Sequence, residues 1–136
     1  MSIAPAAFAK AARSLVGTPF RLRGRNPASG VDCIGLVAVS LERCGSARFP
    51  LPRYELRNTD IHGLLRLLPE AGFGPASDKI AAGDLLLTRP GPAQHHLAIA
   101  TGKGSFIHAH AGLGRVVETP APLPWPLAGH WRLIPS

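Results

Sequence analysis

The chain has 136 residues, enough to bury a continuous core, and we predict one domain over residues 1–136. Hydrophobic residues make up 46% of it and charged residues 17%, which excludes wholesale disorder, and two cysteines exclude a disulfide scaffold. The net charge of +7 suits an anionic setting, but with aromatic residues at 6% we expect a solvated basic surface and no nucleic-acid partner.

Three helices are predicted, over residues 5–17, 31–45 and 59–69. The first and third show the spacing of apolar residues that is typical of an amphipathic helix. The second is apolar nearly all round, so it should be central and buried, with Asp32 at or near its N-cap and Gly45 ending it. The intervening stretches 21–30 and 48–58 are rich in turn residues or broken by proline, and we predict a polar loop and an irregular connection there.

After Gly83 the character of the sequence changes to short apolar runs separated by glycine and proline. They predict strands over residues 83–89, 95–102, 105–110, 114–120 and 130–134. Helices followed by an antiparallel sheet predict an α+β fold. No run approaches ~18 apolar residues, so no membrane span is expected. The N-terminus lacks a basic region before its apolar part, so no signal peptide is predicted and we expect synthesis in the cytoplasm.

Cys33 lies at the start of the predicted central helix. Backbone N–H groups and the positive end of the helix dipole stabilise a thiolate there, so a nucleophilic Cys33 would have a lowered pKa. The alternative is a buried structural sulfur. Cys44 lies too far along the same helix, by ~16 Å, to form a disulfide with Cys33, and we interpret it as structural.

A cysteine nucleophile needs a base, and the base needs an orienting group. Four of the six histidines fall within residues 95–110, which we predict to form a hairpin. A three-residue loop at 102–104 places His110 opposite His96, with His108 diagonal to His96 on the same face and its Cβ ~7 Å away. A two-residue loop would put His96 and His108 on opposite faces, so contact between the imidazoles depends on this register.

Two other interpretations of these histidines stay open at this point. They could be satisfied by backbone groups, or they could hold a metal together with a cysteine. The adjacent His95 and His96 point to opposite faces of a strand, and no CxxC or HExxH spacing is present. We therefore predict no metal site.

The chain resembles the NlpC-type cell-wall cysteine peptidases, which are compact papain-like enzymes. The resemblance runs from about residue 15 to 118 and rests on four stretches in the family's order, namely "DCIGLV" (32–37), "AAGDLLL" (81–87), "HHLAIATGKGSFIHA" (95–109) and "GRVVE" (114–118). It implies a papain-like α+β fold, with N-terminal helices and a central helix that bears the cysteine at its N-terminus and packs on an antiparallel sheet.

The resemblance also implies roles for individual residues. Cys33 corresponds to the nucleophile, His96 to the general base and His108 to the orienting residue, a part that His110 would take if the register slipped. The residues expected to bind substrate are Asp32, Phe20, His95 and His110. Asp32 would meet a free amine of the substrate.

The implied reaction is hydrolysis of peptide bonds in peptidoglycan stem peptides, commonly the γ-D-glutamyl to diamino acid bond. It would proceed through thiolate attack and an acyl-enzyme, with no cofactor. Two residues depart from the family pattern, Ile34 for a serine and Phe20 for a tyrosine. The alternatives are an inactive or weakly active structural component of the same fold and a Cys–His acyltransferase or amidase.

In its predicted lack of a signal peptide and of a wall-binding module, the chain resembles the phage-tail and gene-transfer-agent branch of this family. That branch would make other tail proteins of a phage-like particle its partners, besides peptidoglycan.

Overall fold

The structure, a computed structural model, describes residues 3–45, 58–92 and 94–134. Its elements in chain order are α1 (Pro5–Arg13), β1 (Arg25–Asn26), β2 (Gly30–Val31), α2 (Cys33–Arg43), α3 (Asn58–Leu67), β3 (Phe73–Pro75), β4 (Leu85–Thr88), β5 (His96–Ala100), β6 (Ser105–His110), β7 (Arg115–Pro120) and β8 (Leu127–Leu133). No helix in these described ranges combines the length and apolar character needed to cross a membrane.

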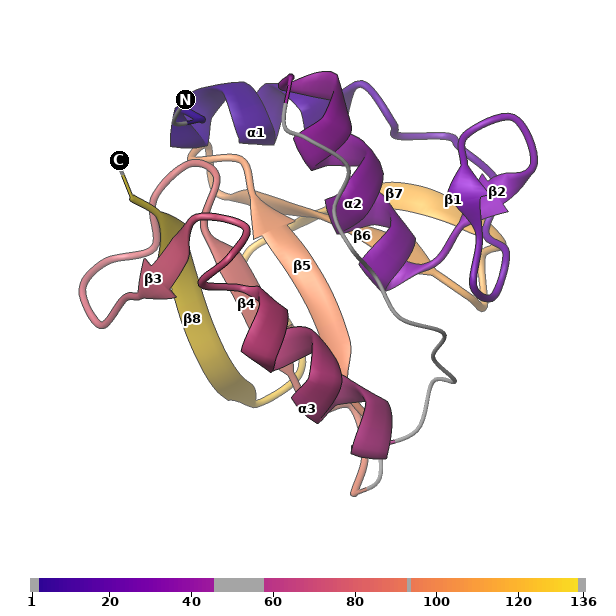
Figure 1. Cartoon of the computed structure of the whole chain (residues 1–136). Helices are drawn as coiled ribbons and strands as arrows, with labels where there is room; N and C mark the ends of the chain where they lie inside the picture. The colour runs from indigo at the N-terminus through magenta and orange to yellow at the C-terminus, as the bar shows by residue number, and fades with distance from the viewer. Residues whose placement is uncertain (1–2, 46–57, 93, 135–136) are drawn as a thin grey trace.

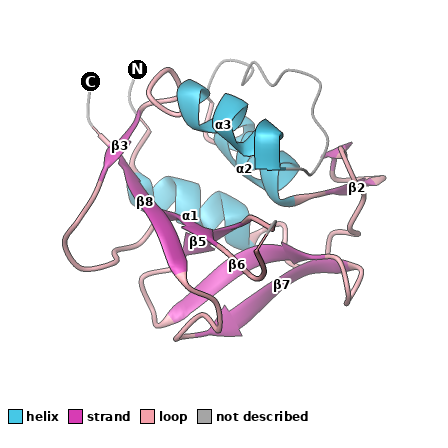
Figure 2. Ribbon diagram, turned by 90° about the horizontal axis from the view of Figure 1, so that it is seen from below, coloured by secondary structure: helices cyan, strands magenta, loops and turns pink. Residues whose placement is uncertain are grey.

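Six strands form one antiparallel sheet in the order β3-β8-β4-β5-β6-β7, and β1 pairs with β2 in a separate small hairpin. The helices lie against one face of this curved sheet (Figures 1 and 2). Helices that pack on one side of an antiparallel sheet define an α+β fold, as predicted.

The main core lies between the helices and the sheet. Phe8 of α1 and Leu36 of α2 belong to the same buried cluster as Leu85 and Ile99 of the central strands. A smaller cluster on the other face consists of Leu86, Ala98, Ala100 and Phe106, with Leu123 packed against it. Successive strand residues alternate between the two clusters, as the pleat of a sheet requires.

Several predicted bounds differ from the observed ones. The first helix ends at Arg13, and residues 17–20 bond to the start of β7 and the residue before it, through Gly17 N–H to the Val116 carbonyl and Phe20 N–H to the Gly114 carbonyl. The predicted polar loop contains β1 and β2. Strand β3 was not predicted, because a short stretch with glycine and proline gives no strand signal. Most of the predicted connection 48–58 lies outside the described residues.

The central helix α2 begins and ends where the sequence predicts. The Asp32 carboxylate is its N-cap and accepts the Gly35 N–H at 2.8 Å, and Gly45 follows the helix with a φ of +86°. A side chain at Gly35 would collide with the Gly24 carbonyl. The glycine in the Asp-Cys-Ile-Gly stretch therefore lets the loop between α1 and α2 pass directly over the first turn of the helix.

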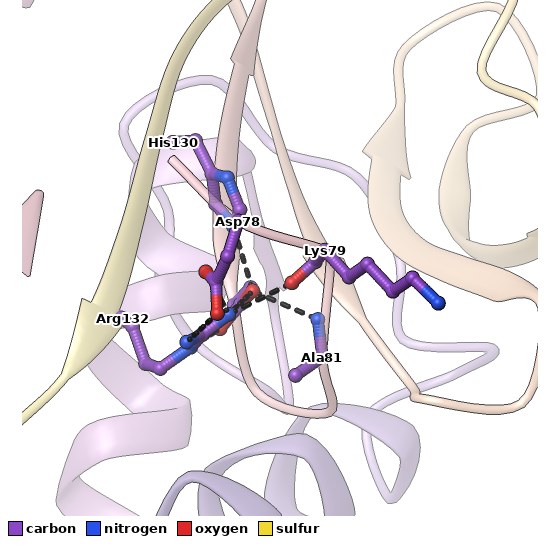
Figure 3. A network of polar contacts seen from close by, with 6 residues as sticks. Asp78, Lys79, Ala81, His130 and Arg132 are labelled. Carbon is purple, nitrogen blue, oxygen red and sulfur yellow. Dashed lines mark hydrogen bonds and ion pairs between the residues drawn. The ribbon is translucent and has the colours of Figure 1, made fainter. Parts of the chain in front are cut away.

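A charged network joins the start of β4 to β8. The buried Asp84 carboxylate accepts hydrogen bonds from His130 at 2.6 Å, from Arg132 at 2.8 and 2.9 Å, and from the Ala81 N–H at 2.8 Å. Arg132 extends the network to the exposed Asp78 and to the Lys79 carbonyl (Figure 3). Burial acts to raise the pKa of Asp84, but the hydrogen bonds from Arg132, Ala81 and His130 more than offset it and the pKa is lowered.

Candidate active site

Cys33 is the first residue of α2, and its side chain is enclosed, with 5% of the residue exposed. The pKa of the thiol is raised to about 12, mainly by burial and in addition by the negative charge of Asp32. Backbone groups of Leu97, Ile34 and Cys33 itself act in the opposite direction. The predicted lowering of the Cys33 pKa is therefore wrong. The helix terminus does favour the thiolate, but desolvation by the overlying structure is the larger effect.

Asp32 is fully buried, with 0% exposure, and each of its carboxylate oxygens accepts a backbone N–H. Oδ1 accepts from Gly35 and Oδ2 from Arg23, both at 2.8 Å. A carboxylate that caps a helix and fixes the preceding loop has a structural role. The carboxylate has no exposed surface in this structure, and contact between Asp32 and a substrate amine stays a prediction.

The two histidines of the predicted hairpin are in direct contact. Nε2 of His96 lies 2.9 Å from Nδ1 of His108. The pairing of Ile99 with Ile107 and of Ala100 with Phe106 is the register that places residue 96 opposite 110. The three-residue turn and the shared face of His96 and His108 are confirmed. It is His108, not His110, that bonds to His96.

Thr119 of β7 continues this chain of side chains, with its hydroxyl 2.7 Å from Nε2 of His108. One arrangement of protons leaves Nδ1 of His96 free to accept a proton. His96 Nε2–H donates to His108 Nδ1, and His108 Nε2–H donates to the Thr119 hydroxyl oxygen. Thr119 was missed from the sequence, because its position beside His108 depends on the pairing of β6 with β7.

Trp125 covers the histidine pair. Its ring lies edge-on to both imidazoles, with centroids 5.2 Å from His96 and 5.8 Å from His108. Such a cover excludes water from the His96–His108 hydrogen bond and strengthens it. Trp125 lies in a proline-rich segment between β7 and β8, where no local pattern indicates a role at the site.

Both histidines are held in the neutral form. The pKa of His96 is lowered to about 4, mainly by burial and in addition by the nearby His108 and His110. The pKa of His108 is also lowered to about 4, by burial and by His110. At neutral pH the site therefore contains a thiol and neutral imidazoles rather than a thiolate–imidazolium pair.

The first residues of α2 approach strand β5 at Leu97, the residue after His96. The backbone of Leu97 acts on the Cys33 sulfur, whereas His96 and Cys33 themselves, both described, are not joined by a hydrogen bond in this structure. Since Nε2 of His96 is engaged by His108, Nδ1 is the nitrogen that has to take the thiol proton.

Of the other predicted substrate-binding residues, His110 lies beside the histidine pair, and the roles of Phe20 and His95 stay predictions. Phe20 is partly buried against the core cluster that contains Cys33, and it forms a bridge to Val31. His95 is half-buried just before β5, and His110 ends β6 beside His108, with ring centroids 5.8 Å apart. Among the described residues no group of three or more His, Cys, Asp or Glu is arranged to hold a metal ion.

Described residues line two hollows that bear on the site. One of about 180 Å³ adjoins His96 and is lined by Pro90, His96, His110, Ala111, Gly112 and Trp125. A larger one, about 420 Å³, lies between α1 and the turn of the β5–β6 hairpin, with Lys10, Arg13 and Lys103 at its rim. The larger hollow contains neither a thiol nor an imidazole, so we place the chemistry at the smaller one.

The fold and site define a class: a papain-like α+β domain with a cysteine at the start of its central helix and a histidine pair on the neighbouring strands. The chain belongs to the NlpC/P60 family, whose sequence profile matches residues 17–125.

The relatives include characterised wall enzymes. The chain is 26% identical over 103 residues to the murein DD-endopeptidase MepS/murein LD-carboxypeptidase of Escherichia coli strain K12, covering 76% of this chain and 48% of that protein. The chain thus spans about half the length of that curated relative.

Two solved structures support the same placement. An NlpC/P60 family protein from Bacillus cereus superposes with a TM-score of 0.70 at 22% identity, over 99% of this chain and 42% of the other. The NlpC/p60 domain of the peptidoglycan hydrolase SagA gives a TM-score of 0.56 at 28% identity, over 85% and 88%. The first likeness shows the fold, and both agree with the predicted papain-like architecture.

Proposed function

We propose that the chain is a cysteine peptidase that hydrolyses peptide bonds in peptidoglycan stem peptides, with the γ-D-glutamyl to diamino acid bond as its target. One observation carries the proposal: His96, whose Nε2 lies 2.9 Å from Nδ1 of His108, begins β5, and the backbone of the next residue of β5, Leu97, meets the sulfur at the start of α2. Membership of the NlpC/P60 family and the names of its relatives supply the class of substrate.

The chemistry follows from the neutral state of the site. As the Cys33 sulfur attacks the scissile carbonyl, Nδ1 of His96 takes the thiol proton. The backbone N–H of Cys33 at the helix start donates to the oxyanion that forms. The imidazolium of His96, oriented by His108, then gives its proton to the leaving amine. Water, activated by the same imidazole, hydrolyses the thioester and regenerates the thiol.

General-base activation suits a thiol whose pKa is about 12, because little thiolate exists before substrate binds. The base must be neutral to act, and the pKa of His96, lowered to about 4, keeps it so across the neutral range. We therefore expect kcat/KM to fall on the acid side only as the pH approaches about 4, where His96 takes up a proton.

Digestion of purified peptidoglycan and of a synthetic stem peptide tests the proposal, with products identified by mass spectrometry. Wild type should release fragments cut between D-glutamate and the diamino acid, and Cys33→Ala should release none. Cys44→Ala is the matched control. Cys44 lies at the far end of α2, so this variant should cleave the substrate as well as wild type does. Equal product from wild type and Cys33→Ala would refute the proposal.

A second candidate function, a catalytically inactive structural component of the same fold, is favoured by the raised pKa of Cys33. The two candidates differ in what substrate does to the thiol. In the peptidase, a stem-peptide substrate should protect Cys33 from iodoacetamide relative to Cys44. In an inactive component, the ratio of the two alkylation rates should be the same with and without the peptide.

A further inference from the structure

The hollow beside His96 contains a second imidazole whose direction is fixed by the fold. It is the imidazole of His110, at the end of β6. Its Nδ1 accepts the Leu113 N–H at 3.0 Å, and its carbonyl accepts the Gly114 N–H at 2.9 Å. The tight turn over residues 110–114 therefore holds both the backbone and the ring of His110.

Gly112 completes this arrangement. A side chain at this position would place its Cβ 3.1 Å from Cε1 of His110, so the glycine lets the turn close against the ring. A nitrogen that accepts a hydrogen bond carries no proton, so in the neutral ring the proton is on Nε2. The turn thus fixes His110 as a hydrogen-bond donor through Nε2 at the edge of the hollow.

The remaining walls of the hollow are mostly apolar. Trp125, Pro90 and Ala111 supply carbon surface, and none of the six lining residues is acidic. An apolar wall with one fixed donor suits an aliphatic chain that ends in a hydrogen-bond acceptor, of which a carboxylate is the strongest.

The position of the hollow indicates which half of the substrate enters it. His96 lines it, whereas Cys33 does not. During cleavage the acyl half stays bonded to the Cys33 sulfur, and the leaving amine takes its proton from His96. The space bounded by His96 but not by Cys33 is therefore on the leaving side of the scissile bond.

We propose that this hollow binds the side chain of the leaving diamino acid and that His110 Nε2–H donates to a carboxylate oxygen at the end of that chain. The inference rests on the proposed stem-peptide hydrolysis and deepens it, since it makes His110 the residue that selects a diamino acid with a second carboxylate. Diaminopimelic acid has this carboxylate, and lysine has a similar chain without it.

The test compares two peptides with the same acyl half, γ-D-glutamyl-meso-diaminopimelic acid and γ-D-glutamyl-lysine. Wild type should have a kcat/KM about tenfold or more higher for the first, the value of one hydrogen bond to a charged group. His110→Leu, which has no donor, should reduce this ratio to near one. His110→Gln, whose amide can place an N–H near the position of Nε2, should retain part of the preference.

The ratio of the two substrates is measured within one protein sample, so a loss of folded protein cancels. If His110→Leu keeps the wild-type preference, or if wild type cleaves both peptides equally, the inference is wrong and the proposed hydrolysis stands. If wild type cleaves neither peptide, the proposed function fails and the inference fails with it.

Discussion

The network around Asp84 is held by charge, whereas the network around His96 and His108 is neutral. Both are built on neighbouring strands of the same sheet, the first across β4 and β8 and the second across β5 and β6 (Figure 1). In the first, a buried carboxylate has a cationic partner and its pKa is lowered. In the second, buried imidazoles have no anionic partner within the part of the chain that the structure describes, and their pKa values are lowered to about 4.

This difference teaches how one sheet can serve two purposes. A buried charge with satisfied partners is costly to disturb, so the Asp84 network fixes how β4 and β8 meet. A buried neutral base stays available for proton transfer, so the His96 network suits chemistry. The five predictions below test this division between structure and reaction.

The largest effect is expected from removing the base. His96→Gln should lower kcat/KM for stem peptides about 10³-fold, because the thiol then has no proton acceptor. The free energy of unfolding, from urea titration, should change by no more than about 1 kcal/mol, since glutamine still has a donor for His108. If His96→Gln instead lost much stability and kept its activity, the His96 network would be structural and this prediction would be wrong.

Asp84→Asn should show the opposite pattern. We expect the free energy of unfolding to fall by about 2–3 kcal/mol, somewhat less than for a wholly enclosed pair, because the Arg132 side chain is 28% exposed. Activity per folded molecule should stay close to wild type. Asp78→Asn is the matched control: its side chain is 69% exposed, and its bond to the same arginine should matter far less.

The two networks should also fail in different pH ranges. Between pH 6.5 and about 4 the unfolded chain binds protons at residues 96 and 108 that the folded chain does not, so the free energy of unfolding should fall by several kcal/mol. The lowered pKa of Asp84 means that its contribution is lost only at lower pH, as the carboxylate is protonated. Melting temperatures across this series check the order.

A variant lacking both histidines, His96→Gln with His108→Gln, separates the two ranges. Its melting temperature should change less with pH than that of wild type between pH 6.5 and 4, and it should still drop at lower pH. If the variant and wild type lose stability in parallel across the upper range, the histidines are not the groups responsible.

Asp32→Asn removes the charge beside the nucleophile. The Cys33 pKa should fall, because Asp32 contributes to raising it, and alkylation by iodoacetamide at pH 8 should become several-fold faster. Reaction at Cys44 in the same protein serves as the internal reference. The asparagine NH₂ cannot accept the Arg23 or Gly35 N–H, so some stability should also be lost. An unchanged rate would mean that burial alone sets the pKa.

The smallest effect is expected at the end of the histidine chain. Thr119→Val removes the hydroxyl that accepts from His108, and kcat should fall about 3-fold while KM stays near wild type. Thr119→Ser, which keeps a hydroxyl, should restore most of kcat. A loss that serine does not restore would point to packing rather than to the hydrogen bond.

Local sequence signals determined more of this site than of its surroundings. The turn at residues 102–104 and the two-residue period of a strand were enough to place His96 beside His108. The N-cap at Asp32 followed from residue type and position alone.

The rest depends on contacts that no local pattern encodes. Trp125 reaches His96 from a proline-rich segment 29 residues later, and Arg132 reaches Asp84 through the pairing of β8 with β4. The position of Cys33 at a helix terminus predicted a lower thiol pKa. Burial raises that pKa instead, and local sequence does not show it because the strands that bury the sulfur lie far away in sequence. Assembly into a phage-like particle and cytoplasmic synthesis stay predictions.

The burial of Cys33 at the start of α2 also affects how fast its thiol reacts with oxidants and alkylating agents. With a pKa of about 12, only roughly one Cys33 thiol in 10⁵ is ionised at pH 7, and peroxides and alkylating agents react with the ionised form. We therefore expect the protein without substrate to resist the oxidants that would destroy an exposed thiolate. The same property implies that simple thiol reagents will be poor inhibitors, and that effective ones must first occupy the site and make use of His96.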